Sequence, residues 1–286
     1  MNLKINILLL NWNSSTDIIS SIENILNSDY KNFRIILIDN FSKEDDIKNL
    51  KCIHEKYKDL CEIHLLLNNE NYGYAGGNNR GYEYLVDNNF EGDILVLNPD
   101  VNISTNTLFE LQNSLNENIG GVMCRTLKSD SSIMYDYIKL NGYFQKWLIT
   151  DENIMETDYL AGSCMFLKRE IIDKIGLFDE SFFMYWEEVD LSFRIRKEGY
   201  KLVSITKTSI ARADNPMERS ANAIYFTIRN SLKIYKKHNL FKLHSLMLYF
   251  FYSLLSSVKY SLIYKNSIFI KKYFLGINHG AKFIFK

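Results

Sequence analysis

Residues 68–101 read NNENYGYAGGNNRGYEYLVDNNFEGDILVLNPDV, which predicts a glycine- and asparagine-rich loop, then an amphipathic segment, then an apolar strand. Glycines let a backbone approach a bulky anionic ligand, and the first N–H groups of a following helix can bind that ligand. The strand ends on Asn98 and Asp100, where one carboxylate and substrate phosphates can together hold a magnesium-like ion. The stretch therefore predicts a nucleotide-diphosphate site. The alternative is a glycine-rich turn before an ordinary strand with a polar end.

Strand and helix patterns alternate on both sides of this stretch. Apolar runs predict strands in four places, and helical spacing predicts helices between them; the strands are 5–10, 33–38, 63–67 and 94–97, and the helices are 18–26, 43–58 and the segment around Tyr82. Thr16 and Ser104 are the expected N-caps of the first helix and of a helix that bears Leu108, Leu111 and Leu115. This alternation predicts an α/β fold with a mostly parallel, Rossmann-like central sheet.

Composition is that of a folded globular chain. With 286 residues, 47% of them hydrophobic, the chain can form one large domain or one domain with an appendage. The four cysteines form no CxxC pair, and we interpret them as free thiols in a reducing cytoplasm. The apolar run at the start lacks a small-residue cleavage site, so it is interpreted as the first buried strand and not as a signal peptide.

Charge is distributed unevenly along the chain, although the total is zero. Residues 219–286 contain Arg219, Arg229, ten lysines and no Asp or Glu, which gives this segment a charge of +12. The first 218 residues carry 22 basic and 34 acidic side chains, a charge of −12. The asymmetry predicts that the C-terminal segment faces an anionic partner.

The same segment is apolar between its lysines. Leu243 to Val258 is rich in Leu, Phe and Tyr, and only about 15 residues separate Lys242 from Lys259, fewer than the roughly 20 that a spanning helix needs. A surface-lying helix or a hairpin of two, with lysines toward acidic headgroups, is the favoured interpretation; those lysines are Lys265, Lys271, Lys272, Lys282 and Lys286. Nucleic acid is disfavoured because the segment is too apolar. The alternative is a helical pair that packs on the domain or on a second subunit.

Asp39 follows the second predicted strand, at the sheet edge where Asp100 is also expected. There it could accept a hydrogen bond from a base or a ribose. It could equally cap the turn formed by residues 42–46.

A second cluster of acidic residues begins the helix predicted near residue 187. Glu187, Glu188 and Asp190 crowd its first turn, and a buried strand is expected before them at Tyr159 to Leu167. Acidic residues stabilise a helix N-terminus, and Asp190 can pair with Arg194 one turn later. Aromatic residues directly precede the cluster, and a carboxylate among aromatic rings has a raised pKa that suits a general base.

With these motifs the chain resembles the inverting family 2 glycosyltransferases of the GT-A fold, in a rhamnosyltransferase-like branch. The resemblance runs from Ile5 to about Ile277. It rests on seven blocks in the same order: NWNS at 11–14, IDNFS at 38–42, NENYGYAGGNNRGY at 69–82, LNPDV at 97–101, AGSCMFLKRE at 161–170, GLFDESFFMYWEEVDLSFRIRKEGY at 176–200 and IRNSLKIYKKH at 228–238.

The resemblance implies roles for individual residues. Asp39 matches the acid that binds the nucleobase, Asn98 and Asp100 take the place of the DxD metal motif, and Glu188 stands where the general base stands. The implied catalytic group is Glu188 with Glu187 and Asp190. The implied donor site comprises Asn11, Asn13, Asp39, Asn71, Gly73, Gly77, Asn79, Arg80, Asn98 and Asp100. The implied acceptor side comprises Gly162, Ser163 and Trp186, and Arg229 and Asn230 match a segment that follows the catalytic domain.

The resemblance also implies an activity: inverting transfer of a sugar, with rhamnose as one candidate, from a UDP or dTDP donor. The expected acceptor is a hydroxyl of a lipid-linked or growing cell-surface glycan, and the expected cofactor is Mg²⁺ or Mn²⁺ at Asp100. Residues 1–215 would form the catalytic domain. Residues 216–286 would form a helical extension that binds the cytoplasmic face of the plasma membrane or makes a homodimer.

Three features depart from the family pattern. Asn98 replaces the first acid of DxD, Glu188 replaces the commoner Asp, and Ala211 or Arg212 stands where a metal-side histidine is often found. An arginine can neutralise a diphosphate in place of a metal ligand. Two other classes of protein stay open: a nucleotide-sugar-binding protein without transfer activity and, ranked last, a nucleotidyltransferase, since NWNSST replaces the triphosphate loop expected near the N-terminus.

Overall fold

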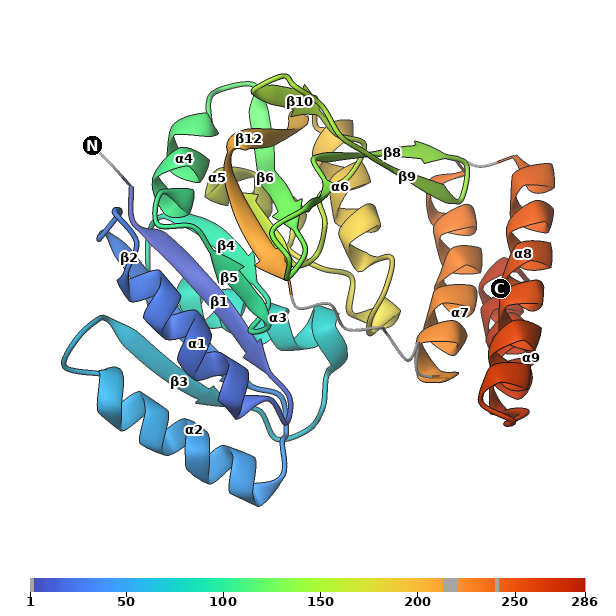
Figure 1. Cartoon of the computed structure of the whole chain (residues 1–286), viewed down its shortest axis with the longest axis horizontal. Helices are drawn as coiled ribbons and strands as arrows, with labels where there is room; N and C mark the ends of the chain where they lie inside the picture. The colour runs from blue at the N-terminus through green and yellow to red at the C-terminus, as the bar shows by residue number, and fades with distance from the viewer. Residues whose placement is uncertain (1–2, 213–220, 240–241, 286) are drawn as a thin grey trace.

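The computed structural model describes residues 3–212, 221–239 and 242–285. Figure 1 shows an α/β part with three long helices standing beside it. The first half of the chain alternates strands and helices: β1 (Ile5–Asn11), α1 (Ser15–Leu26), β2 (Phe33–Asp39), α2 (Glu44–Tyr57), β3 (Ile63–Leu67), α3 (Gly73–Asp87), β4 (Asp93–Leu97), β5 (Val101–Ile103) and α4 (Thr107–Ser114).

The second half begins with antiparallel pairs and ends in helices. Its first elements are β6 (Ile119–Leu127), β7 (Ile133–Tyr135), β8 (Tyr137–Asn141), β9 (Phe144–Leu148), β10 (Ile154–Glu156) and β11 (Cys164–Leu167). The next are α5 (Arg169–Ile175), the 3₁₀ turn η1 (Glu180–Phe182), α6 (Glu187–Lys197) and β12 (Lys201–Arg212). The C-terminal helices are α7 (Ala221–His238), α8 (Leu243–Ile263) and α9 (Ile268–Phe285).

The central sheet has the strand order β10-β12-β6-β11-β4-β1-β2-β3. Strands β4, β1, β2 and β3 are parallel, and β11 runs antiparallel between β4 and β6. The α/β fold with a mostly parallel sheet is thereby confirmed. The carboxyl ends of β1, β2 and β4 lie at one edge together with the amino end of β11, and ligands of open α/β sheets bind at such an edge.

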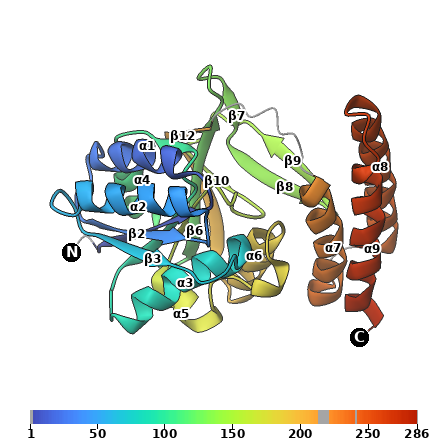
Figure 2. The same cartoon turned by 90° about the horizontal axis from the view of Figure 1, so that it is seen from below.

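Helices cover both faces of this sheet, which explains why all seven residues of β2 are buried. Helices α1, α2 and α4 lie on one face and α3, α5 and α6 on the other (Figure 2). The core therefore consists of two apolar layers separated by the sheet.

The glycine-rich stretch is helical, which corrects the expected loop. Helix α3 already begins at Gly73, so most of these glycines lie inside it. A Cβ at Gly77 would stand 2.6 Å from Leu10 Cδ1, and one at Gly81 would stand 2.4 Å from Ile38 Cδ1. These glycines bring α3 close to β1 and β2, and it is the start of the helix that lies at the ligand edge.

Three other local predictions are wrong. Helix α1 has Ser14 at its N-cap, and α4 has Asn106, so Thr16 and Ser104 do not cap them. The hydroxyl of Ser104 donates to the carbonyl of Ser209 in β12 instead, because β5 comes between β4 and α4 and pairs with β12. Only Cys164–Leu167 of the strand expected at 159–167 pairs in the sheet.

Helices α7, α8 and α9 pack on the α/β part and on one another. Leu232 of α7 and Leu246 of α8 belong to the same buried cluster as side chains of α3 and α6. Helix α9 approaches α7 closely at Gly276 and Gly280, where an added Cβ would stand 2.9 Å from a carbonyl oxygen of α7. The hairpin β8–β9 extends toward the C-terminal helices (Figure 1). The rings of Tyr143, in its turn, and Tyr249, in α8, are stacked at 5.2 Å.

The expected helical hairpin is present as α8 and α9, but the length assigned to its first arm is wrong. Helix α8 has 21 residues and continues past Lys259 to Ile263. By length and composition alone, it could cross a membrane. Its outer face is an exposed apolar stripe made of Met247, Phe251, Leu255, Val258 and Leu262. Arg219, Lys286 and the domain boundary expected at residues 215–216 lie outside the described residues.

Candidate active site

Asn11, at the end of β1, connects the loops that follow β1 and β2. Its side-chain amide donates to Asp39 Oδ1 (3.0 Å), Ser42 Oγ (3.1 Å) and Asp46 Oδ2 (2.7 Å). Burial raises the pKa of Asp46, but hydrogen bonds from Ser15, Asn11 and Ser42 outweigh it and leave the pKa below its ordinary value. Asp46 of α2 was not predicted as part of this network, because its partners Asn11 and Ser15 belong to β1 and α1, far from it in the sequence.

Asp39 is completely buried at the end of β2. Its Oδ2 accepts from the backbone N–H of Ser42 (3.1 Å), so the turn-cap interpretation is confirmed. Asn13 caps the same loop, since its Oδ1 accepts from the N–H of Lys43 (2.8 Å). Contact of Asp39 and Asn13 with a nucleotide stays a prediction.

Asn40 holds the start of α3 against this loop. Its amide donates to Asn71 Oδ1 (3.0 Å) and to the carbonyl of Gly73 (2.9 Å). Gly73 has φ +71°, and a Cβ there would stand 2.4 Å from the carbonyl oxygen of Phe183. That carbonyl accepts from the N–H of Ala75 (3.0 Å), so the start of α3 touches the segment that leads to Glu187.

Asn79 and Arg80 point from α3 toward the η1 turn. Asn79 exchanges hydrogen bonds with the backbone of Phe178 (2.9 and 3.0 Å), and Arg80 forms ion pairs with Glu180 and Glu83. The structure thus gives both residues contacts within the protein, and their expected contact with a diphosphate stays a prediction.

Asp100 is half-buried just beyond β4. The N–H of Asn98 donates to the carbonyl of Ser163 (3.0 Å), which joins the end of β4 to the start of β11. Across residues 3–212, 221–239 and 242–285, the Asp100 carboxylate has no hydrogen-bond or ion-pair partner, and no cluster of three metal-binding side chains is found. A free oxygen donor of this kind suits a hard cation whose other ligands are phosphate oxygens and water. Arg212 lies close by, paired across the sheet with Val101.

Tyr74 lies between the Asp100 side and the Glu188 side of the edge. Its hydroxyl donates to the carbonyl of Gly162 (2.5 Å). Burial raises the pKa of Tyr74 well above its ordinary value, and the carboxylates of Glu187, Glu188 and Asp100 raise it further. All three carboxylates are therefore within electrostatic reach of one phenol. Tyr74 was not predicted from the sequence, where its signal is an aromatic side chain among the glycines.

Glu187 and Glu188 open α6 as predicted. Burial raises the pKa of Glu187 well above its ordinary value, and the charges of Glu188 and Asp190 raise it further. Burial also raises the pKa of Glu188, to about 7, against the lowering effect of hydrogen bonds from the backbone at Glu188 and Trp186. The Oε2 atom of each glutamate is buried and has no hydrogen-bond partner in the described part of the chain. Glu188 can therefore take up or release a proton near neutral pH.

Asp190 and Trp186 are held by the C-terminal helices. Asp190 is fully buried and pairs with Arg194 (2.9 Å), as predicted, and also with Lys237 (2.8 Å) and His238 (2.7 Å) of α7. Trp186 is 4% exposed, and its indole N–H donates to the carbonyl of Thr227 in α7 (3.2 Å). Both side chains therefore anchor α7 to the start of α6, where Glu188 lies. Their expected catalytic and acceptor-side roles stay predictions.

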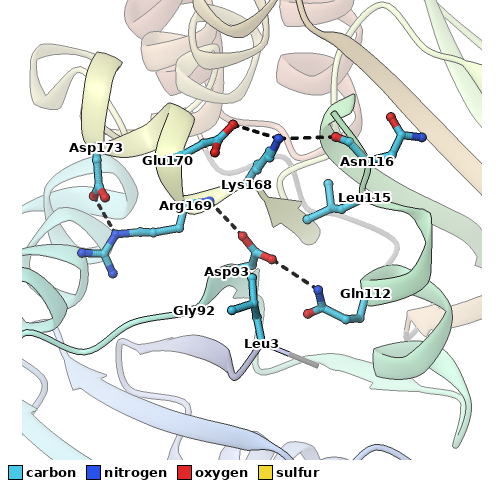
Figure 3. A pocket seen from close by; sticks show the side chains of 10 residues that line it. All are labelled: Leu3, Gly92, Asp93, Gln112, Leu115, Asn116, Lys168, Arg169, Glu170 and Asp173. Atoms are coloured by element: carbon cyan, nitrogen blue, oxygen red, sulfur yellow. Dashed lines mark hydrogen bonds and ion pairs between the residues drawn. The ribbon is translucent and has the colours of Figure 1, made fainter. Parts of the chain in front are cut away.

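A groove of about 470 Å³ lies at the opposite edge of the sheet (Figure 3). Its polar groups bind one another: Asp93 accepts from Gln112 and from the N–H of Arg169, Arg169 pairs with Asp173, and Lys168 pairs with Glu170. Each of the charged side chains that line this groove in the described part of the chain therefore already has a partner.

The sequence pattern of Glycosyl transferase family 2 matches residues 7–176, more than half of the chain. The chain belongs to this family. The matched residues of this family 2 glycosyltransferase include the ends of β1, β2 and β4 and the whole of α3. The chain is therefore a transferase enzyme.

Characterised relatives agree with this assignment. The low-salt glycan biosynthesis hexosyltransferase Agl10 of Haloferax volcanii is 28% identical over 68% of this glycosyltransferase and 73% of its own length. The rhamnosyltransferase WbbL of Escherichia coli K12 is 25% identical over 65% of this chain and 75% of its own. The relatives are thus hexosyl- and rhamnosyltransferases.

The fold of this family 2 glycosyltransferase is that of solved GT-A enzymes. The mannosyltransferase PcManGT from Pyrobaculum calidifontis, solved in complex with GDP-Man and Mn²⁺, superposes with a TM-score of 0.59 at 12% identity. The match covers 99% of this chain and 86% of PcManGT. It confirms the GT-A fold.

Proposed function

We propose that this enzyme transfers a sugar, with inversion, from a nucleoside diphosphate donor to a hydroxyl of a lipid-linked or growing cell-surface glycan. One observation carries the proposal: at the edge where β4 ends, Tyr74 lies within electrostatic reach of both the Asp100 carboxylate, which has no partner among the described residues, and Glu188, whose pKa is raised to about 7. An inverting transferase needs a group for the leaving diphosphate and a base for the acceptor, one on each side of the sugar.

The reaction follows from these positions. Glu188 removes the proton of the acceptor hydroxyl while the acceptor oxygen forms a bond to C1 of the sugar. The bond between C1 and the diphosphate oxygen breaks in the same displacement, and the nucleoside diphosphate leaves with the bonding electrons. Mg²⁺ or Mn²⁺, when held by Asp100, would neutralise the charge on that diphosphate. Arg212 would add a second positive charge near the same place.

The donor sugar is proposed as a hexose or rhamnose, because Agl10 is named a hexosyltransferase and WbbL a rhamnosyltransferase. UDP and dTDP remain the proposed carriers. PcManGT contains GDP-Man, so GDP sugars belong in the same screen. Thermal-shift measurements with each class, with and without Mg²⁺ or Mn²⁺, would identify the donor.

Two substitutions test the assignment of base and donor groups. With the identified donor, Glu188→Gln and Asp100→Ala should each lower kcat by roughly 100-fold or more while circular dichroism shows an intact fold, since each removes a group used in the transition state. Glu117→Gln, an exposed change at the opposite end of the sheet, is the control and should leave kcat unchanged. Near-normal turnover of Glu188→Gln would contradict the assignment and favour Glu187. Donor binding without turnover by the unmodified enzyme would favour the non-catalytic alternative.

We further propose that the enzyme works at the cytoplasmic face of the plasma membrane. The exposed stripe of α8 and the excess of twelve positive charges over residues 219–286 support an anionic lipid surface as the partner. A second copy of the chain is the alternative partner for this stripe.

A further inference from the structure

The segment before the proposed base has an unusual backbone. Phe183, Tyr185 and Trp186 have φ values of +65°, +66° and +75°, and none of them is glycine. Bulky side chains disfavour this left-handed region, so surrounding contacts must hold the segment in place. Trp186 is the N-cap residue of α6, and Glu188 lies only two residues later.

One side chain of α7 holds most of this segment. Asn230 is completely buried, and its Nδ2 donates to the carbonyls of Phe182 (2.9 Å), Met184 (2.8 Å) and Tyr185 (2.8 Å). These carbonyls converge on one amide because the left-handed residues turn the backbone around it. An amide N–H donor at this position therefore selects the conformation of the segment.

Arg229 supports the same arrangement from the next position of α7. Its Nε donates to Asn230 Oδ1 (2.8 Å), and its Nη2 donates to the carbonyls of Ser181 (2.9 Å) and Phe182 (2.6 Å). The ring of Phe226 stacks on Phe183 at 4.9 Å. One face of α7 thus contacts the segment from Ser181 to Trp186.

The conformation of Trp186 bears directly on Glu188. Backbone hydrogen bonds at Trp186 and Glu188 stabilise the charged form of the Glu188 carboxylate and lower its pKa. Among the described residues, the charge of Glu188 raises the pKa of Glu187 on its own helix, of Tyr74 from α3 and of Tyr159 from the segment before β11. Loss of the Trp186 conformation would remove one of the hydrogen bonds that favour the charged base.

We propose that Asn230, supported by Arg229, is a positioning residue of this enzyme: it fixes the backbone that aims Glu188 at the acceptor hydroxyl. The inference rests on the proposed role of Glu188. It gives α7 a part in positioning the base, because Asn230 and Arg229, which make these hydrogen bonds, both belong to that helix.

The chain contains a matched control for a purely structural role. Asn6 is also completely buried, and its Nδ2 donates to three successive carbonyls, those of Glu91, Gly92 and Asp93 (3.1, 3.1 and 3.4 Å). Its Oδ1 accepts from an arginine, Arg34 (2.8 Å), just as Asn230 Oδ1 accepts from Arg229. Asn6 lies at the opposite edge of the sheet, so Asn6→Ala removes the same set of bonds far from Glu188.

The test compares Asn230→Ala and Asn6→Ala in the full-length enzyme. Both should lower Tm by similar amounts, but only Asn230→Ala should lower kcat, by about 30-fold or more, with the donor KM changed less than about 3-fold. The midpoint of the acidic limb of its kcat–pH profile should also move upward, because the charged base loses a hydrogen bond. Asn230→Gln, which keeps the amide, should recover part of kcat.

Hydrogen exchange separates this proposal from the proposed function. Amides of residues 182–190 should exchange faster in Asn230→Ala than in Asn6→Ala, with no substrate present. Equal exchange in the two variants, or equal losses of kcat at equal losses of Tm, would show that Asn230 only stabilises the fold. Faster exchange together with full activity of Glu188→Gln would instead overturn the role of Glu188 and, with it, the positioning role of Asn230.

Discussion

Three carboxyl groups within four residues, Glu187, Glu188 and Asp190, differ because of what surrounds them. Asp190 has three partners, Arg194, Lys237 and His238, and although burial raises its pKa, hydrogen bonds from His238 and Lys237 leave it below the ordinary value. Among the described residues, no basic side chain pairs with Glu187 or Glu188. The sequence could predict the acidic first turn and the pair with Arg194 because both are local. It could not predict the pairing of Asp190 with His238, which lies 48 residues away and is set by the packing of α7.

The raised pKa of Glu188 predicts that its charged carboxylate destabilises the folded enzyme. The folded-state pKa of Glu188, about 7, lies above the pKa of an unfolded glutamate. The stability that its protonation contributes is fully present below pH about 4.5 and is lost as the pH rises through about 7.

Glu188→Gln should therefore be inactive and yet more stable than the natural enzyme at pH 8, by roughly 2–4 °C in Tm for each 1 kcal/mol recovered. Differential scanning calorimetry at pH 5 and pH 8 measures the difference. A smaller gain at pH 5 is part of the prediction, because Glu188 in the folded enzyme is then protonated and uncharged, like glutamine. An equal effect at both pH values would argue against a titrating Glu188.

At the scale of elements, α3 connects the two sides of the site. Its presence was predictable from helical spacing after Tyr82, but its start at Gly73 was not, because glycine is a poor helix former and the reason for these glycines is contact with β1, β2 and Phe183. Strands β7 to β10 were not predicted, since they are short and antiparallel, and β6 was not predicted although it has nine residues and is parallel to β12. The parallel strands β1 to β4 were predicted because they are continuous apolar runs.

Gly73→Ala should weaken the packing of the start of α3 on the segment before Glu187. Both Gly73 and Gly176 have left-handed backbone, with φ +71° and +75°, but an added Cβ would meet Phe183 only at Gly73 and nothing within 4 Å at Gly176. Each Gly→Ala change should cost roughly 1–3 kcal/mol for the backbone alone. The further loss in Gly73→Ala, seen in chemical denaturation and in kcat, measures the contact with Phe183. Equal effects of the two changes would mean that the contact is unimportant.

Charge and exposed apolar side chains are unevenly distributed over the whole molecule. The acidic surplus belongs to the residues that precede position 219, and the basic surplus belongs to the segment that contains α7, α8 and α9. The sequence revealed this polarity but not which apolar side chains stay exposed. That depends on how α8 and α9 pack on α7. The inner faces of these helices pack on one another and on the α/β part, whereas the side chains of the α8 stripe stay exposed.

Replacing Phe251, Leu255 and Leu262 together by serine should release the full-length enzyme from anionic vesicles, because these side chains are 49–73% exposed on one face of α8. The measurement is co-sedimentation with phosphatidylglycerol vesicles, with phosphatidylcholine vesicles and added salt as comparisons. The control replaces Trp147, Ile149 and Ile154, which are also about half-exposed but lie near β9 and β10. Unchanged vesicle binding, or a dimer that the α8 variant abolishes in analytical ultracentrifugation, would assign the stripe to a second copy of the chain.

The clamp made by Asn230 also has a consequence for synthesis on the ribosome. Asn230 follows Phe182, one of its acceptors, by 48 residues, so the segment before Glu188 emerges well before the amide that holds it. A nascent chain that ends before α7 can form the parallel strands and yet lack a finished base. The enzyme should therefore become active only after its last quarter has been translated. Products truncated before α7 should fold in their α/β part but lack activity.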